Sequence, residues 1–399
     1  MLPLTTPLNW QRVRLGDIAE IKRGASPRPI ENPKWFCANS NVGWARISDI
    51  SKNSRFLYKT AQKLSKKGIE KSRLVKQNSL IMSMCATIGK PIITKIDTCI
   101  HDGFVVFENP KIDLNYLYYF LCYIEKEWLE SGQQGSQVNL NVDLIKNKEV
   151  FYPKDLNEQI AIANILSGLD RYLHALNSLI LKKESVKKAL SFELLSQRKR
   201  LKGFNQAWQR VRLGDICEFG NGEAYETLIV ENGDFKLISL NSIDIDGNLK
   251  NTMKRVNFYD NSLKQDDIVM VLSDVAHGDF LGLCAVIPSN DYVLNQRMGR
   301  LRIRNDCINI LFLRLYINAN QKYFKMQGQG SSQLNLSKKA IEDFEIPLPP
   351  LNEQIAIADI LSALDKEIAS LKNKKRQFEN IKKALTHDLM SAKIRVLKK

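Results

Sequence analysis

The sequence predicts an α+β protein in which two globular α/β domains are separated by a long antiparallel two-helix coiled coil, arranged as a pseudo-two-fold internal repeat. Three observations predict this fold. The segment 156–196 recurs 195 residues later, at 351–391. A nine-residue segment, WQRVRLGDI, opens both domains, at Trp10 and at Trp208. Short apolar runs bounded by glycine and asparagine lie between these landmarks and are typical of β-strands.

Each copy of the repeated segment predicts one long helix. Both copies begin with LNEQIAIA, and they match at about half of their positions. Apolar residues follow in steps of four and three, which is the pattern of a coiled-coil seam. These residues are Ile162, Leu166, Leu169, Leu173, Leu176 and Ile180 in the first copy, and Ile357, Leu361, Leu364, Ile368 and Leu371 in the second. A helix of this length would span about 60 Å, and the nearest partner for its seam is its own repeat.

The repeat also predicts the domain boundaries: a first domain at 1–155, a first spacer helix at 156–202, a second domain at 203–350 and a second spacer helix at 351–399. Asn157 and Asn352 are the expected helix N-caps. Because the ends of a compact domain often lie close together, the second domain implies that the helices run antiparallel. By symmetry, Met1 and Lys399 would be neighbours, with the two domains at opposite ends of the rod.

Within each domain we expect a mostly antiparallel, curved sheet followed by one helix. The expected strands are 80–84, 91–95 and 104–107 in the first domain, and 236–240, 267–272 and 299–303 in the second. The expected helices are 114–130 and 308–325. The two domains differ in sequence between the shared landmarks, so they are expected to differ in what they bind.

The charge of the chain points to a polyanionic partner. Its 59 Lys and Arg residues exceed its 43 Asp and Glu residues, for a net charge of +16. Nucleic acid fits this charge better than an anionic membrane surface. The chain has no run of 18 apolar residues and no signal peptide at its start, so a cytoplasmic protein is expected. Its seven cysteines are scattered, which suits reduced thiols.

No catalytic motif is found. The sequence contains no N-P-P-[YF] motif of amino-methyltransferases, no phosphate-binding G-x-x-x-x-G-K-[ST] loop and no H-E-x-x-H. Glu20 and Lys22 have the E-x-K spacing of some nucleases, but an isolated triplet of this kind is common. His101 and His277 are more typical of structural histidines than of a binding face. No catalytic residue, metal ligand or cofactor site is therefore predicted in this chain.

Two loops rich in Gly, Gln, Ser and Asn are the first candidates for nucleic-acid contact. Their amide and hydroxyl groups can bond base edges or phosphates, and their glycines allow close approach. The candidate residues are Gln133, Gln134, Ser136 and Gln137 in the first loop, and Gln329, Ser331, Ser332 and Gln333 in the second. Because both domains carry this loop, a shared structural or backbone-contact role is as plausible as base recognition.

Sequence discrimination is expected from residues that differ between the domains. Arg and Lys suit guanine or phosphate, and Asn and Gln suit adenine. The first domain offers Lys22, Arg23, Arg28, Trp35, Trp44, Arg46, Ser48, Lys52, Asn53, Arg55 and Lys90. The second offers Asn221, Tyr225, Asn241, Ser242, Asn248, Lys250, Lys254, Arg255, His277, Asn295, Gln296 and Arg297. Trp10 and Trp208 are interpreted as packing residues between domain and helix.

These motifs together resemble the specificity subunit of type I restriction–modification systems. The resemblance is carried by the paired LNEQIAIA openings, the paired RLGDI segments, residues 85–90 (CATIGK) and residues 137–140 (QVNL). It implies that each domain is a target recognition domain for one half of a split, asymmetric site in double-stranded DNA. It also implies that the coiled coil sets the spacing and docks two methyltransferase (modification) subunits, and through them the restriction subunits. S-adenosylmethionine, ATP and Mg would bind those partners.

Three other classes stay open: a stand-alone DNA-binding protein or regulator without enzyme partners, an enzyme in its own right, and a scaffold with no role on DNA. Co-purifying subunits, methyl transfer by the purified chain and salt-dependent DNA binding would separate them.

Overall fold

The computed structural model describes residues 9–51, 55–131, 140–275 and 278–396. The chain divides into two compact units, one of residues 1–177 with 373–399 and one of residues 178–372. Each unit combines a globular domain with one half of each long helix. The domains are called head one (residues 9–155) and head two (residues 203–350). None of the described helices is both long enough and apolar enough to cross a membrane.

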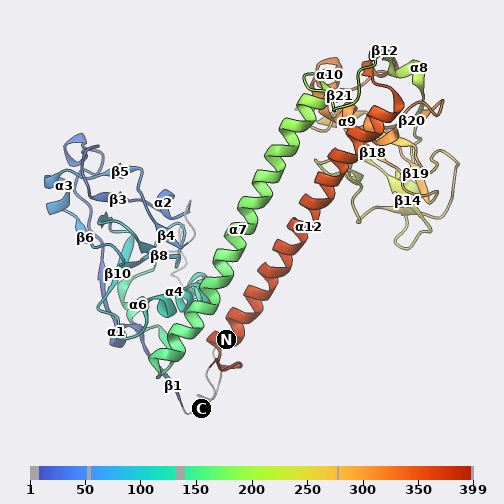
Figure 1. Ribbon diagram of the computed structural model, residues 1–399. Coiled ribbons are helices and arrows are strands. Elements are labelled where there is room, and N and C mark those ends of the chain that lie inside the picture. Colours follow the sequence, from blue (N-terminus) through green and yellow to red (C-terminus); the bar gives the residue numbers. More distant parts are fainter. Residues whose placement is uncertain (1–8, 52–54, 132–139, 276–277, 397–399) are drawn as a thin grey trace. The chain divides into compact units, whose positions relative to one another are not determined.

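The two long helices are α7 (Leu156–Leu195) and α12 (Leu351–Met390), the green and red helices of Figure 1. Both helices begin at the predicted residue and end within one residue of the repeated segments 156–196 and 351–391, but before the predicted ends of the spacer helices at 202 and 399. The predicted N-caps are wrong. Asn157 is the second residue of α7, and its N–H donates to Asp155 Oδ1 at 2.9 Å, so Asp155 is the capping side chain. Asn352 also lies inside its helix, where the Pro350 carbonyl accepts the Glu353 N–H at 2.9 Å.

Within each unit, the α7 half and the α12 half run antiparallel. In the first unit, Asp170 pairs with Lys382, and Asn177 accepts a hydrogen bond from Lys375 at 2.8 Å. In the second, Lys183 pairs with Glu367 and Glu184 with Lys372, both at 2.8 Å. The predicted seam is buried at Ile162, Leu166, Leu176, Ile180, Ile357, Leu361 and Ile368, and half-buried at Leu169, Leu173, Leu364 and Leu371. The predicted antiparallel pairing is confirmed.

Each helix begins with a buried glutamate held by an arginine that follows the end of the other helix. In the first unit, Arg395 donates to both oxygens of Glu158, at 2.6 and 2.8 Å. In the second, Arg200 does the same to Glu353, at 3.1 and 2.5 Å. Both arginines occupy the same place in the repeat. These two-bond pairs fix the helix ends, because a buried carboxylate is stable only when its charge is compensated.

Head one contains three sheets. Strands β1 (Trp10–Arg14) and β11 (Glu149–Pro153) pair beside α7. The five-stranded sheet has the order β2-β10-β7-β8-β4, and the four-stranded sheet has the order β5-β3-β9-β6. Their bounds are β2 (Glu20–Arg23), β10 (Phe104–Glu108), β7 (Leu80–Ser83), β8 (Pro91–Thr94), β4 (Phe56–Leu57), β5 (Gln62–Lys63), β3 (Gly43–Ala45), β9 (Thr98–Ile100) and β6 (Arg73–Val75). The helices are α1 (Leu15–Ile18), α2 (Ile47–Ser51), α3 (Lys66–Glu70), α4 (Leu114–Tyr123), α5 (Glu125–Ser131) and α6 (Val142–Asn147).

Head two repeats the main pairings. Strands β12 (Gln209–Arg212) and β22 (Glu345–Leu348) match β1 and β11. The principal sheet has the order β13-β20-β16-β18, with bounds β13 (Cys217–Asn221), β20 (Met298–Ile303), β16 (Ile268–Val271) and β18 (Cys284–Val286). The other strands are β15 (Arg255–Val256), β14 (Phe235–Ile238), β19 (Tyr292–Leu294), β17 (Ser273–Val275) and β21 (Gln333–Asn335). The helices are α8 (Leu213–Ile216), α9 (Ile310–Ala319), α10 (Gln321–Gln327) and α11 (Lys338–Glu342).

All six predicted strands are present and their pairing is mostly antiparallel, as predicted, but the number of sheets in each head and the single domain helix were predicted wrongly. Each head has several small sheets in place of one, and parallel pairs occur between β3 and β9, β4 and β8, and β14 and β19. Each predicted domain helix is two helices in the structure. The predicted helix 114–130 is α4 and α5, which separate at Ile124, and the predicted helix 308–325 is α9 and α10, which separate at Asn320. Asn320 donates through its side chain to the Tyr316 carbonyl at 2.8 Å, which takes over a main-chain acceptor at the helix end.

The core of each head extends onto the long helices. In the first unit, Trp10 and Phe151 belong to one apolar cluster with Leu166 of α7 and Leu389 of α12. In the second unit, Trp208 packs against the matching cluster, and its indole N–H donates to Glu353 at 3.0 Å. The interpretation of both tryptophans as packing residues between domain and helix is therefore confirmed.

Candidate nucleic-acid interface

In head one, a set of backbone hydrogen bonds joins the ends of three adjacent strands. The chain leaves β2 through Gly24, whose N–H donates to the Phe104 carbonyl at 2.8 Å. A Cβ atom on Gly24 would lie closer to the His101 carbonyl than real Cβ atoms ever do, so only glycine fits. After β7, the Met84 N–H donates to the Gly103 carbonyl at 2.8 Å. These bonds bring residues 23, 84–85 and 101–103 together.

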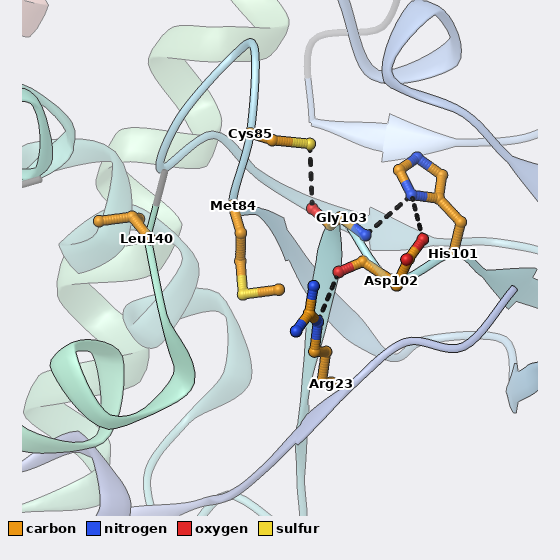
Figure 2. Close-up of a pocket in the computed structure, with 7 residues that line it drawn as sticks. All are labelled: Arg23, Met84, Cys85, His101, Asp102, Gly103 and Leu140. Carbon is orange, nitrogen blue, oxygen red and sulfur yellow. Dashed lines mark hydrogen bonds and ion pairs between the residues drawn. The ribbon is translucent and has the colours of Figure 1, made fainter. Parts of the chain in front are cut away.

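A pocket of about 340 Å³ lies at this point (Figure 2). It is lined by Arg23, Met84, Cys85, His101, Asp102, Gly103 and Leu140. The Arg23 Nε donates to the Asp102 carbonyl at 2.8 Å, which holds the arginine against the pocket. The Leu140 N–H donates to the Met84 carbonyl at 3.0 Å. Leu140 directly follows the first Gly/Gln/Ser loop, so that loop ends beside the pocket.

His101 and Asp102 of the pocket have settled protonation states at neutral pH. Burial lowers the pKa of His101 to about 4, so its ring is neutral. The Gly103 N–H donates to His101 Nδ1 at 2.9 Å, which assigns the ring proton to Nε2. Burial alone would raise the pKa of Asp102, but hydrogen bonding from Ser26 and the charge of Arg28 lower it overall. The pocket therefore presents a cation, a neutral imidazole and an ion-paired carboxylate.

Head two contains the same set of backbone bonds with different side chains. The Gly222 N–H donates to the Met298 carbonyl at 3.2 Å, and Gly222 has no room for a Cβ atom against Asn295. The Leu272 N–H donates to the Arg297 carbonyl at 3.0 Å, as Met84 does to Gly103. Strand pairing agrees, because Arg23 opposes Val105 and Asn221 opposes Gly299. We call this shared set of backbone hydrogen bonds the strand-end frame. It makes five pairs of positions equivalent between the heads: Arg23 and Asn221, Cys85 and Ser273, His101 and Asn295, Asp102 and Gln296, and Gly103 and Arg297.

The second Gly/Gln/Ser loop is a hairpin that lies beside this frame. Its return strand β21 pairs with β17, and Gln329 and Asn335 exchange two backbone hydrogen bonds, at 3.0 and 2.9 Å. Gly330 has φ +124, which only glycine adopts readily. The Leu336 N–H donates to the Leu272 carbonyl at 2.9 Å, the equivalent of Leu140 to Met84. Leu140 and Leu336 are therefore attached to the frame in the same way in the two heads.

The structure brings several predicted residues together at this place. Arg23 lines the pocket of head one, while Asn221, Gln296 and Arg297 lie on the frame of head two. The side chains of Gln329, Ser331 and Ser332 are exposed on the adjacent hairpin, and Gln333 is half-buried. Such amide, hydroxyl and guanidinium groups can bond base edges and phosphates, which is recognition chemistry.

Other predicted residues are bound to protein groups. Lys22 pairs with Glu20 and Glu108, at 2.9 and 2.6 Å. Arg28 pairs with Asp102, and Arg46 donates to Gln62 at 3.3 Å. In head two, Tyr225 donates to Asp260 at 2.9 Å and Arg255 to the Gly233 carbonyl at 2.8 Å. Elsewhere on the heads, Ser48, Asn241, Lys250 and Lys254 are exposed and Lys90 is half-buried.

Five predicted contact residues are buried and support the fold instead: Trp35, Trp44, Arg55, Ser242 and Asn295. Trp44 has no exposed surface and packs in a small cluster with Trp35 and Leu64. Ser242 is buried, and its hydroxyl caps the Ser239 N–H at 2.9 Å. Arg55 is buried and donates to Tyr119, Ser167 and Asn115, at 3.0, 2.7 and 2.6 Å. Because Ser167 lies on α7, Arg55 connects head one to the helix.

Seven predicted residues lie outside the described residues: Lys52, Asn53, Gln133, Gln134, Ser136, Gln137 and His277.

The candidate set missed Cys85, His101 and Asp102, which line the pocket. The glycines could have located them: Gly24 and Gly222 each lie eight residues after the glycine of RLGDI. Extending the repeat to this pair would have aligned Arg23 with Asn221. It would not have placed residues 101–103, because the intervening segments differ in length.

The helices carry a second surface that occurs twice. Leu156 and Ile160 of α7 are exposed, 53% and 39%, and the equivalent Leu351 and Ile355 of α12 are exposed, 36% and 38%. Residues four apart lie on one face of a helix. Each unit therefore presents the same small apolar surface at the start of one long helix.

The duplicated strand-end frame, with different side chains on a shared backbone, defines a protein with two related but non-identical recognition surfaces. The model of the type I restriction modification DNA specificity domain matches residues 7–184 and again residues 205–380. The chain belongs to this family.

The chain is also similar over its length to named relatives. It is 26% identical to the type I restriction enzyme MjaVIII specificity subunit of Methanocaldococcus jannaschii, over 98% of this chain and 95% of that protein. Its fold is similar to the crystal structure of the S subunit from M. genitalium, with a TM-score of 0.65 and 18% identity over 97% and 98% of the two chains. The HsdS subunit from Thermoanaerobacter tengcongensis gives a TM-score of 0.51 at 17% identity, over 98% and 99%.

Proposed function

We propose that this chain is the DNA sequence-recognition subunit of a type I restriction–modification complex. Each head recognises one half of a bipartite, asymmetric site in double-stranded DNA, and the paired helices set the distance between the halves. The observation that carries this proposal is the strand-end frame. Two heads with one backbone arrangement and different side chains at five equivalent positions suit two different half-sites.

The proposal assigns no catalytic step to this chain. Methyl transfer belongs to partner methyltransferase subunits that bind S-adenosylmethionine, and ATP and Mg belong to the restriction subunits. The complex works in the cytoplasm. The net charge of +16 supports binding to DNA, because Lys and Arg side chains neutralise phosphates and release counterions.

Two methyltransferase subunits dock on the long helices, one on each of the repeated apolar surfaces. The equivalence of Leu156 and Ile160 with Leu351 and Ile355 supports two copies of one partner, since identical surfaces bind identical partners. Replacing Ile160 or Ile355 with Glu is expected to remove one methyltransferase subunit, and replacing both is expected to remove two. Native mass spectrometry of the co-purified complex measures this. Ile245→Glu is the matched control, because Ile245 is 62% exposed but lies on head two.

The function itself is tested by co-expressing the chain with its candidate methyltransferase subunit in a host that lacks such systems. Long-read sequencing then maps the methylated positions in the genome. We expect one asymmetric motif of two parts with a fixed gap, present only when both proteins are made. Methylation by the methyltransferase alone, or by this chain alone, would contradict the assignment. Specific DNA binding by a chain that recruits no methyltransferase would favour a stand-alone regulator.

A further inference from the structure

Arg297 is the place where the two strand-end frames differ most, because head one has Gly103 there. A Cβ atom on Gly103 would lie 2.5 Å from His101 Cε1 and 2.6 Å from Cys85 Sγ, so head one has no room for a side chain. In head two the same backbone position carries the longest cationic side chain. Both residues give their carbonyl oxygen to the frame, at 2.8 Å from Met84 N and 3.0 Å from Leu272 N.

The backbone of Arg297 is in a conformation that arginine rarely adopts. Its φ is +67, in the left-handed region that favours glycine. An unfavourable conformation of this kind is retained where the side chain has a task. The Arg297 side chain is exposed, and within the described part of the chain its guanidinium forms no hydrogen bond or ion pair.

The side chains of the two residues before Arg297 are held by hydrogen bonds, whereas the Arg297 guanidinium forms none within the described residues. Gln296 and Asn295 both donate to Glu226 Oε1, at 2.7 and 3.0 Å. These bonds, with the Gln296 contribution the largest, lower the pKa of Glu226, so the carboxylate stays charged. Asn221, at the end of β13, is exposed beside the frame. Within the described residues, the site therefore presents an exposed guanidinium without a hydrogen bond or ion pair, next to the Gly/Gln/Ser hairpin, and its charge also lowers the pKa of the nearby Glu226 carboxylate.

We propose that Arg297 determines the specificity of head two by bonding a guanine in the major groove, an inference that rests on the proposed function. An arginine fork matches the O6 and N7 acceptors of guanine, and this pair is the commonest specific contact between protein and DNA. A phosphate contact is the other use of such a cation. A phosphate contact serves any sequence, so both heads would keep it, whereas head one has glycine at this position.

The test uses the reconstituted complex with its methyltransferase subunits and a library of sites randomised in both half-sites. Arg297→Gly removes the side chain and fits the left-handed backbone, so head two should keep its fold. We expect discrimination to fall by about tenfold or more at one G·C pair of the second half-site, with the first half-site unchanged. Arg297→Lys keeps the charge but lacks the planar fork, so it should lose the same discrimination.

Arg304→Ala is the matched control. Arg304 is an exposed arginine of the same head that follows the other end of β20. It should leave the motif unchanged. Uniform weakening of all sequences by Arg297→Gly, with a shallower salt dependence, would identify a phosphate contact and overturn the proposal. An unchanged motif would overturn it as well. A wild-type complex that yields no two-part motif would instead show that the proposed function is wrong.

Discussion

The buried glutamate at the start of α7 gives a prediction with a built-in control. Glu158 is 2% exposed and accepts two hydrogen bonds from Arg395. Arg395→Ala leaves this carboxylate buried without its counter-charge. Breaking a fully buried pair costs about 3–5 kcal/mol. Because the Arg395 side chain is itself 33% exposed, we expect a cost below that range, about 2–3 kcal/mol.

The equivalent substitution in the second unit should cost less. Arg200→Ala also removes two bonds, but Trp208 still donates to Glu353 at 3.0 Å. Among the described residues, the corresponding indole nitrogen of Trp10 has no hydrogen-bond partner, so it does not donate to Glu158. The difference between the two variants is therefore about one hydrogen bond to a charged group, roughly 1–2 kcal/mol.

Hydrogen exchange measured by mass spectrometry distinguishes the two ends. Peptides covering 156–166 should exchange faster in Arg395→Ala, by about 30-fold or more, while peptides covering 351–361 stay at the wild-type rate. Arg200→Ala should show the opposite pattern with a smaller increase. A Glu158→Gln/Arg395→Ala double variant should recover part of the loss, because it removes the uncompensated charge. Equal exchange in wild type and both variants would refute the idea that these pairs fix the helix ends.

Three further predictions concern the heads. Gly24→Ala and Gly222→Ala should each abolish selection of one half-site and leave the other intact, because each added Cβ atom would collide with a carbonyl of the strand-end frame. Methylation mapping measures the selection of each half-site. Loss of both half-sites in either variant would contradict the prediction. Burial lowers the pKa of His101 to about 4, below its usual 6.5. As the pH drops, the His101 ring is therefore protonated in the unfolded chain before it is protonated in the folded chain. The stability of the first unit should fall as pH drops from about 6.5 to 4. Urea unfolding followed by signals from the first unit should show less of this fall in His101→Asn, the residue of head two; an identical pH profile would show that His101 does not contribute. Arg55→Ala should destabilise the first unit by about 2–3 kcal/mol. Arg55→Lys should not restore this stability, because lysine cannot reach Tyr119, Ser167 and Asn115 together. Full stability of the lysine variant would mean that the charge alone matters.

Sequence periodicity was sufficient to predict the long helices, because the seam residues recur every three and four positions without interruption. It also located the strands of the principal sheets, whose apolar runs are continuous. The number of sheets could not be predicted, since strands such as β4 and β5 have two residues each and leave no periodic signal. Their pairing depends on contacts between residues far apart in sequence.

The candidate residues of the interface were selected by residue type alone, and this selection also included residues that are buried. Residue type indicated Arg23, Asn221, Gln296 and Arg297, which the structure places on the strand-end frames of the two heads. It also indicated Arg55 and Trp44, which are buried, because an arginine can donate to hydroxyl and amide oxygens of the protein, and a tryptophan can pack in a core, as readily as either can bind DNA. Composition cannot distinguish these uses. The distinction requires knowing which strand ends meet, and that is set by pairings such as Met84 with Gly103.

The strand-end frame also suggests why two heads with little sequence in common can share one recognition geometry. The contacts that build it are backbone hydrogen bonds and two glycines that tolerate no substitution, so they constrain only a few residues. The remaining positions contribute their main chain to the frame, so their side chains can differ between the two heads. Residue 103 or 297 can thus be glycine or arginine while its carbonyl accepts the same bond. Changing the recognised base then requires a change of side chain, with no change in how the head is attached to its helix.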